Sequence, residues 1–290
     1  MITVAYITGR KDPKWDWFID SLRNQCGEEV RVLVVDFYGR EFRGARTVKP
    51  KPTPWQGEHR VTREDWWAMS NARNTAIINC ETDWLAFCDD RSVLLPTWYG
   101  AVRQAMANRY VVCGSYSKVS GLRVNGGRVE GADVTLGVDS RLALYKGKGP
   151  MTCGGGWVFG CTLALPTEWA YKVNGFEEGC DGLSMEDVIF GLNLQNYGFP
   201  IKYDPYMAMV EDRTVGECVA GHQATFRRED KGVSPRDKSH AALERFGKRM
   251  RTEFTPDLMH LRELVSDKRN LPKPSPDVVD WYDGQPLREM

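Results

Sequence analysis

The sequence has no excess of charge of either sign, because its 290 residues include 39 lysines and arginines against 39 aspartates and glutamates. Such a chain has no overall field to attract nucleic acid or an anionic membrane, so any polyanion must be bound locally. It also lacks a run of about 20 apolar residues that could span a bilayer. The apolar run at residues 2–7 is too short for a signal peptide. We therefore expect a cytoplasmic protein without an integral membrane segment.

The cysteines follow no pattern that would indicate disulfides or structural zinc. There are eight of them, with no Cys-x-x-Cys pair and no Cys/His cluster at zinc spacing. Several lie inside apolar segments, where a reduced cysteine behaves as a small hydrophobic residue. With 42% hydrophobic residues, the chain is long enough to bury a large core.

The first third of the chain alternates short β-rich runs with helical patterns, which is typical of βαβ units. We predict strands at residues 2–7, 30–36, 84–88 and 110–116, and helices at 14–25, 63–79 and 96–106. Further on, we expect hairpins or an insertion at 121–149, an apolar run at 158–165, helices beginning near 167 and 188, and an edge strand at 201–203. The pattern predicts an α/β fold with a mixed, mostly parallel sheet flanked by helices.

The last part of the chain differs in composition. After residue 223 it becomes polar and locally basic, with helical patterns near 239–250 and 256–267 and a proline-rich tail at 273–290. We expect one domain at residues 1–222 and a mostly helical extension at 223–290. The basic residues could be solvated helix faces, a lid over a diphosphate, or a guide for an anionic acceptor.

Two pairs of acidic residues carry the strongest chemical signal. Asp89 and Asp90 follow the apolar run at 84–88, while Glu186 and Asp187 follow a glycine-rich loop and open a helix. Each pair could also have a purely structural role. Asp89 and Asp90 could solvate a turn or cap a helix, and Glu186 and Asp187 are favoured by the helix dipole in a first turn. Together they suit a metal-dependent group transfer, which needs carboxylates to hold a cation against a diphosphate and another carboxylate to accept a proton.

Several segments in about the first 200 residues carry a further pattern: the strand at 32–36, Ser70-Asn71-Ala72-Arg73-Asn74, Asp89-Asp90, Asn174-Gly175-Phe176-Glu177-Glu178 and Glu186-Asp187. In order and spacing they resemble the family-2 glycosyltransferases of the GT-A fold, with Asp89-Asp90 at the DxD position. The resemblance implies a Rossmann-like GT-A domain and an inverting transfer from a nucleotide-sugar, UDP-linked, to a hydroxyl acceptor. It also implies Mn²⁺ or Mg²⁺ as cofactor.

The same resemblance implies roles for individual residues. Asp187 would be the general base, and Glu186 would orient the acceptor or sugar. Asp90 would coordinate the metal ion beside the donor diphosphate. The remaining donor contacts would come from Thr8 beside the nucleotide, Asp36 at the uracil or ribose, Arg73 near the base and Asp89 at the ribose or sugar.

Some features depart from the family pattern or leave two readings open. Arg91 stands where many relatives have a third acid, which implies a metal site completed largely by the donor. A C-terminal metal ligand is expected at His222, with Glu211 as the second candidate. Trp157 follows three glycines and could stack on a sugar or pack in the core.

Two other functions remain open at this point. A sugar nucleotidyltransferase would need a glycine-rich, basic signature after the first strand, and Thr8-Gly9-Arg10-Lys11 is only a faint version of it. A non-catalytic nucleotide- or carbohydrate-binding module would be favoured by loss of the second acid pair, which is present. The acceptor could be a glycan, a lipid, a protein or a modified nucleic acid.

Overall fold

The structure is a computed structural model, and it describes residues 1–51, 69–180, 185–214, 257–259 and 262. The expected extension at 223–290 therefore lies almost entirely outside the described residues, as does His222. The first part of the helix expected at 63–79 is also outside them, whereas its second part is present as α2 (Met69–Asn79).

The N-terminal half of the sheet is parallel, as expected. Strand β1 (Ile2–Thr8) lies between β2 (Val30–Asp36) and β4 (Trp84–Asp89). The short strand β3 (Arg46–Val48) pairs with the other side of β2, at the border of the sheet. Helices α1 (Trp15–Cys26) and α2 make the crossovers between these strands. The strands and helices predicted at 2–7, 14–25, 30–36 and 84–88 are thus confirmed within one or two residues.

The other half makes the sheet mixed. Strand β11 (Thr162–Pro166) runs antiparallel to β4 and β6 (Val111–Ser120), and β12 (Ile201–Asp212) runs parallel to β6. Three short strands pair at its borders: β5 (Ser92–Leu94), β9 (Val134–Val138) and β10 (Met151–Thr152). A separate hairpin, β7 (Arg123–Asn125) and β8 (Arg128–Gly131), confirms the hairpin reading of residues 121–149.

The edge strand expected at 201–203 is wrong in length and place. β12 spans twelve residues and lies between β10 and β6 inside the sheet. The register with β6 shifts between Asp204 and Ala208, so Pro205 falls in a bulge where its missing N–H removes no ladder bond. The apolar run at 158–165 follows a 3₁₀ turn, Gly155–Trp157, and its second half lies in β11.

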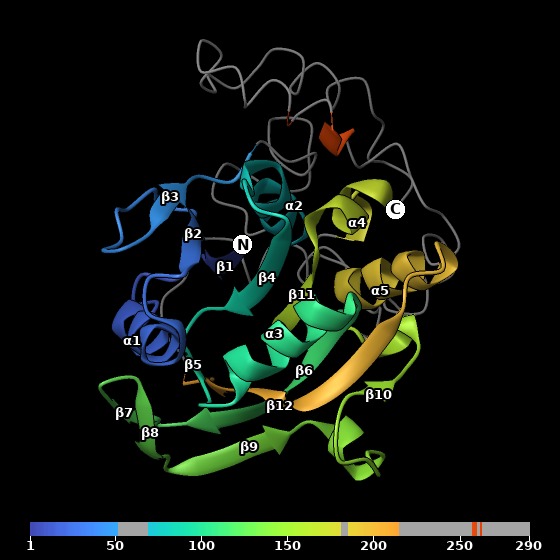
Figure 1. Cartoon of the computed structure of the whole chain (residues 1–290). Coiled ribbons are helices and arrows are strands. Elements are labelled where there is room, and N and C mark those ends of the chain that lie inside the picture. The colour runs from blue at the N-terminus through green and yellow to red at the C-terminus, as the bar shows by residue number, and fades with distance from the viewer. Residues whose placement is uncertain (52–68, 181–184, 215–256, 260–261, 263–290) are drawn as a thin grey trace, which may run out of the picture.

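Helices cover both faces of the sheet (Figure 1). On one face of the sheet, α1 and α3 (Trp98–Asn108) pack on residues such as Tyr6 and Val34. On the other face, α2, α4 (Thr167–Lys172) and α5 (Glu186–Asn196) pack on residues such as Leu85 and Phe87. Burial on both faces explains why the strands read as continuous apolar runs. In the part of the chain described, no helix is both long and apolar enough to cross a membrane.

The middle of α5, the helix that carries Glu186 and Asp187 in its first turn, packs closely on the 3₁₀ turn through two glycines. A Cβ at Gly191 on α5 would lie 2.1 Å from the carbonyl oxygen of Gly155 in the 3₁₀ turn. Gly100 on α3 has no atom within 4 Å of such a Cβ.

We predict opposite effects of alanine at these two helical glycines. Gly191→Ala forces helix and turn apart and should lower the free energy of unfolding by about 1–3 kcal/mol. Gly100→Ala should raise it by up to about 1 kcal/mol, since alanine favours a helix and meets nothing. Urea denaturation of both variants tests this, and equal stability of Gly191→Ala and the wild type would contradict it.

Candidate active site

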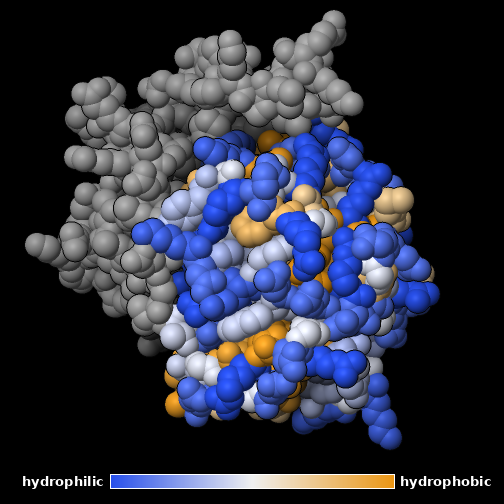
Figure 2. All heavy atoms as spheres, turned by 90° about the vertical axis from the view of Figure 1, so that its left-hand side faces the viewer, coloured by the Kyte–Doolittle hydropathy of each residue, from blue (hydrophilic) through white to orange (hydrophobic). Residues whose placement is uncertain are grey.

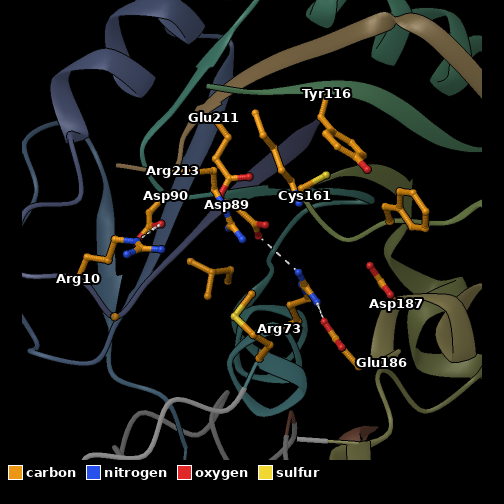
Figure 3. A pocket seen from close by; sticks show the side chains of 15 residues that line it. Arg10, Arg73, Asp89, Asp90, Tyr116, Cys161, Glu186, Asp187, Glu211 and Arg213 are labelled. Carbon is orange, nitrogen blue, oxygen red and sulfur yellow. Dashed lines mark hydrogen bonds and ion pairs between the residues drawn. The ribbon is translucent and has the colours of Figure 1, made fainter. Parts of the chain in front are cut away.

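A cavity of about 460 Å³ opens where β1 and β4 end, at the carboxyl edge of the parallel strands. Both acid pairs line it, Asp89-Asp90 from the end of β4 and Glu186-Asp187 from the start of α5. Its other charged residues are Arg10, Arg73, Lys118, Glu211 and Arg213 (Figure 3). The fold thus brings together the two pairs that the sequence singled out.

Arg73 of α2 connects the two acid pairs. Its Nη1 donates to Oε1 of Glu186 at 2.7 Å, and its Nη2 donates to Oδ1 of Asp89 at 3.4 Å (Figure 3). Only 3% of the side chain is exposed. Burial works against the charged form, but the nearby carboxylates, Asp89 and Glu186 above all, raise the pKa of Arg73 above its ordinary value. The guanidinium therefore links one acid of the first pair to one acid of the second.

Gly160 makes room for this guanidinium. A Cβ at this position would lie 2.3 Å from Cζ of Arg73. The backbone N–H of Gly160 also donates to Oδ2 of Asp187 at 3.0 Å. One glycine in the loop before β11 thus admits the arginine and orients the second acid pair.

Asp187 is set up to accept a proton near neutral pH. Burial, followed by the charge of Glu186, raises the pKa of Asp187 to about 6, and Arg73 and two backbone N–H groups oppose the rise. One of those donors is Gly160, and the other is the N–H of Val188, 2.8 Å from Oδ1. A carboxylate with this pKa matches the requirement for a general base better than an ordinary aspartate does.

Asp90 lies at the other end of the cavity, held by the first strand and the loop that follows it. The hydroxyl of Thr8 donates to Oδ2 of Asp90 at 2.7 Å, and Nε of Arg10 donates to Oδ1 at 3.1 Å. Burial raises the pKa of Asp90 to about 6, against the opposing effects of Arg10 and Thr8. Thr8 is itself fully buried, so its observed part is to position Asp90.

Glu211, near the end of β12, is the third carboxylate at the Asp89-Asp90 end of the cavity. Nη1 of Arg213 donates to its Oε1 at 2.6 Å. Burial and then the charge of Asp89 raise the pKa of Glu211, while Arg213 and Lys118 lower it. The second candidate for a C-terminal metal ligand therefore lies beside the first acid pair.

The oxygen donors at this end fit a hard divalent cation. Asp89, Asp90 and Glu211 offer carboxylate oxygens, which Mn²⁺ and Mg²⁺ prefer. Among the residues that the structure describes, no three acidic, histidine or cysteine side chains converge closely enough to hold a metal ion by themselves. A cation would need oxygens of a bound diphosphate to complete its coordination.

Comparison with known proteins identifies the family. Residues 17–163, half of the chain, match the family model described as glycosyl transferase family 2. The chain belongs to glycosyltransferase family 2. A comparison with curated proteins finds no match.

Solved GT-A glycosyltransferases share the fold of this family-2 chain. Residues 1–349 of S. aureus TarS, in complex with UDP, superpose with a TM-score of 0.50 at 14% identity, over 73% of this chain and 60% of that one. GalNAc-T7 with UDP, GalNAc and Mn²⁺ gives 0.53 at 12% identity, over 92% and 54%. The expected GT-A fold is confirmed, and the chain spans 54–60% of the length of these two structures.

Two family motifs also hold each other in place behind the site. Oδ1 of Asn74 accepts from the N–H of Phe176 at 2.8 Å, and its Nδ2 donates to the Phe176 carbonyl and to Glu178, each at 2.8 Å. The helix that carries Arg73 is thereby anchored to the loop that leads to α5. The sequence showed both motifs but not their contact.

Arg91 does not face the cavity, although it follows Asp90 directly. Its Nη2 donates to Oδ2 of Asp212 at 3.0 Å and its Nη1 to the carbonyl of Thr214 at 2.6 Å. Its backbone lies in the left-handed region, with φ of 55°. The arginine in the third position of the motif thus ties the loop after β4 to the end of β12.

Asp36 and Trp157 lie outside the cavity lining. Asp36 is fully buried, and Arg40 binds both of its oxygens, Oδ1 at 2.7 Å through Nη2 and Oδ2 at 3.1 Å through Nε. Trp157 is half-buried and packs edge-on against Tyr203, with ring centroids 5.4 Å apart. This contact favours the core reading of Trp157, and its role at a donor stays a prediction.

Sequence reasoning assigned no role in this site to Arg10, Lys118 or Arg213, and it named Arg10 only in the faint basic signature after the first strand. Arg10 could have been found, because it comes two residues after the end of the first strand, at the edge where ligands bind. Arg213 had no such signal, since it follows β12, the strand whose length was predicted wrongly.

Because the pKa of Asp187 is raised, we predict that replacing this residue with asparagine increases the stability of the protein at high pH but not at low pH. The charged form of Asp187 is disfavoured in the folded state, so the stability that it contributes is complete below pH 4 and is lost as the pH rises through 6. Asp187→Asn should match the wild type at pH 4 and exceed it at pH 8 by about 1–2 kcal/mol, allowing for solvent screening at a half-buried group.

Urea denaturation at the two pH values measures this difference. Asp83→Asn is the control, because that side chain is 91% exposed and should show no gain at either pH. If Asp187→Asn were no more stable than the wild type at pH 8, the raised pKa assigned to Asp187 would be refuted.

Proposed function

We propose that this protein transfers a sugar from a nucleotide-sugar, UDP-linked, to a hydroxyl acceptor, with inversion at the anomeric carbon. The observation that carries the proposal is the joining of two acid pairs, distant in the sequence, across one cavity by Arg73. Structures of the same fold that contain UDP, UDP-GlcNAc, or UDP with Mn²⁺ support this choice of donor and metal ion. We assign catalysis to residues 1–222 and regard 223–290 as an extension.

The donor would lie with its diphosphate at the Asp89-Asp90 end. A bound Mn²⁺ or Mg²⁺ supplies positive charge against the leaving diphosphate. Asp90 would hold the ion, with Glu211 as a further oxygen donor, and Asp89 would face the ribose or sugar. Thr8 keeps the Asp90 carboxylate aimed into the cavity through its 2.7 Å hydrogen bond.

Asp187 would act from the other end of the cavity. Its carboxylate takes the proton of the acceptor hydroxyl while that oxygen bonds to the anomeric carbon and the bond to the diphosphate breaks. Attack from the face opposite the leaving group inverts the configuration, through an oxocarbenium-like state. Glu186, fixed by Arg73 at 2.7 Å, orients the acceptor or sugar.

Replacing the base should stop transfer without preventing donor binding. Asp187→Asn keeps the size of the side chain but cannot accept the proton, so kcat should fall by about 10²–10⁴-fold. UDP affinity, measured by calorimetry with Mn²⁺, should remain close to that of the wild type. Asp133→Asn, a 65% exposed control outside the cavity, should retain full activity, and full transfer by Asp187→Asn would exclude the assigned role.

The pH dependence of transfer should follow the raised pKa of Asp187. With donor and cation saturating, kcat/KM for the acceptor should be constant above pH 7 and fall about tenfold per unit below pH 6, because the protonated carboxyl cannot act as base. An ordinary aspartate would give this fall near pH 4. A profile that stays flat down to pH 4.5 would contradict the mechanism.

A further inference from the structure

At the donor end of the cavity, arginines pair with two of the carboxylates. Nε of Arg10 lies 3.1 Å from Oδ1 of Asp90, and Nη1 of Arg213 lies 2.6 Å from Oε1 of Glu211. The acids are nearly buried, with side chains 11% and 5% exposed, and the side chains of Arg10 and Arg213 are 16% and 44% exposed. All four residues line the cavity, and Arg213 is the more open of the two cations.

The topology places both arginines where a diphosphate would bind. Arg10 follows the carboxyl end of β1, and Arg213 follows the carboxyl end of β12. Because β11 is antiparallel to both β4 and β6, and β12 is parallel to β6, these two ends meet at the same edge of the sheet. Figure 3 shows both side chains on the Asp90 side of the cavity.

Each arginine gives one of its N–H donors to a carboxylate, and that carboxylate draws the charge of the guanidinium away from a diphosphate. Guanidinium groups recognise phosphate oxygens through paired, charge-assisted hydrogen bonds. In this structure Nε of Arg10 donates to Asp90 and Nη1 of Arg213 donates to Glu211, the same carboxylates that a cation would use. When a donor diphosphate and a divalent cation bind together, all four side chains have a partner. The phosphates then bind the two guanidinium groups, and the cation binds the two carboxylates.

We propose that Arg10 and Arg213 are diphosphate-binding residues, masked by Asp90 and Glu211 until a donor and a cation bind together. The inference rests on the proposed function, because it concerns the same site and the same donor. The inference goes further in two ways. It names the groups that bind the diphosphate, and it states that Asp90 and Glu211 weaken diphosphate binding when no cation is present.

The test uses the sign of the change in UDP affinity, measured by calorimetry in EDTA and in Mn²⁺. In EDTA, Asp90→Asn and Glu211→Gln should each bind UDP about tenfold more tightly than the wild type, because each frees a guanidinium for the phosphates. In Mn²⁺, the same variants should bind UDP more weakly. Arg10→Gln and Arg213→Gln should weaken binding about tenfold in Mn²⁺.

Double variants and a matched pair complete the experiment. Adding Arg10→Gln to Asp90→Asn should abolish the gain in EDTA, which separates unmasking from a general change in the cavity. The exposed pair of Arg123 and Asp133, outside the cavity, gives control variants Arg123→Gln and Asp133→Asn with unchanged affinity. Thermal unfolding confirms that each variant is folded.

The outcomes separate this inference from the proposed function. Unchanged or weaker UDP binding by both carboxylate variants in EDTA would overturn the masking, while Mn²⁺-dependent binding by the wild type would leave the proposed function standing. If the wild type bound no UDP under either condition, both proposals would fail. Tighter binding in EDTA, with the opposite sign in Mn²⁺, supports the exchange of partners.

Discussion

The ion pairs of Arg73 are the interaction on which the site depends. A guanidinium with 3% of its side chain exposed is very costly to bury unless carboxylates surround it. Asp89 and Glu186 provide that charge, and the Phe176 ring, 5.3 Å from Cζ of Arg73, provides a favourable face. Because these partners come from β4, α5 and the loop before α5, one buried cation fixes three parts of the fold relative to one another.

The same pairing recurs along the sheet edge. Arg40 binds Asp36, Arg10 binds Asp90, Arg91 binds Asp212 and Arg213 binds Glu211. The described part of the face in Figure 2 is largely hydrophilic, with a few hydrophobic patches. In each of these four pairs the carboxylate side chain is at most 11% exposed. The charged residues that line the cavity are four basic and five acidic, so the cavity is polar but nearly neutral.

The sheet topology explains why residues so distant in the chain share one cavity. β1, β4, β6 and β12 run in the same direction, so the residues that follow them collect at one edge. β11 runs in the opposite direction, which brings its first residues to that edge too, with Thr162 beside Cys88. Gly160, just before β11, therefore reaches both Arg73 and Asp187.

The sequence by itself determined the elements of the first half and the two acid pairs. The strands at 2–8, 30–36 and 84–89 are buried on both faces, so their continuous apolar runs were visible locally. Only the tertiary structure decided the length of β12, because a bulge accommodates Pro205. It also decided the partners of three buried carboxylates. Asp90 pairs with Arg10, which is distant in the sequence, whereas Asp36 and Glu211 pair with nearby arginines whose side chains the fold turns toward them. The raised pKa values of Asp90 and Asp187 likewise follow from burial, which exists only once the chain has folded.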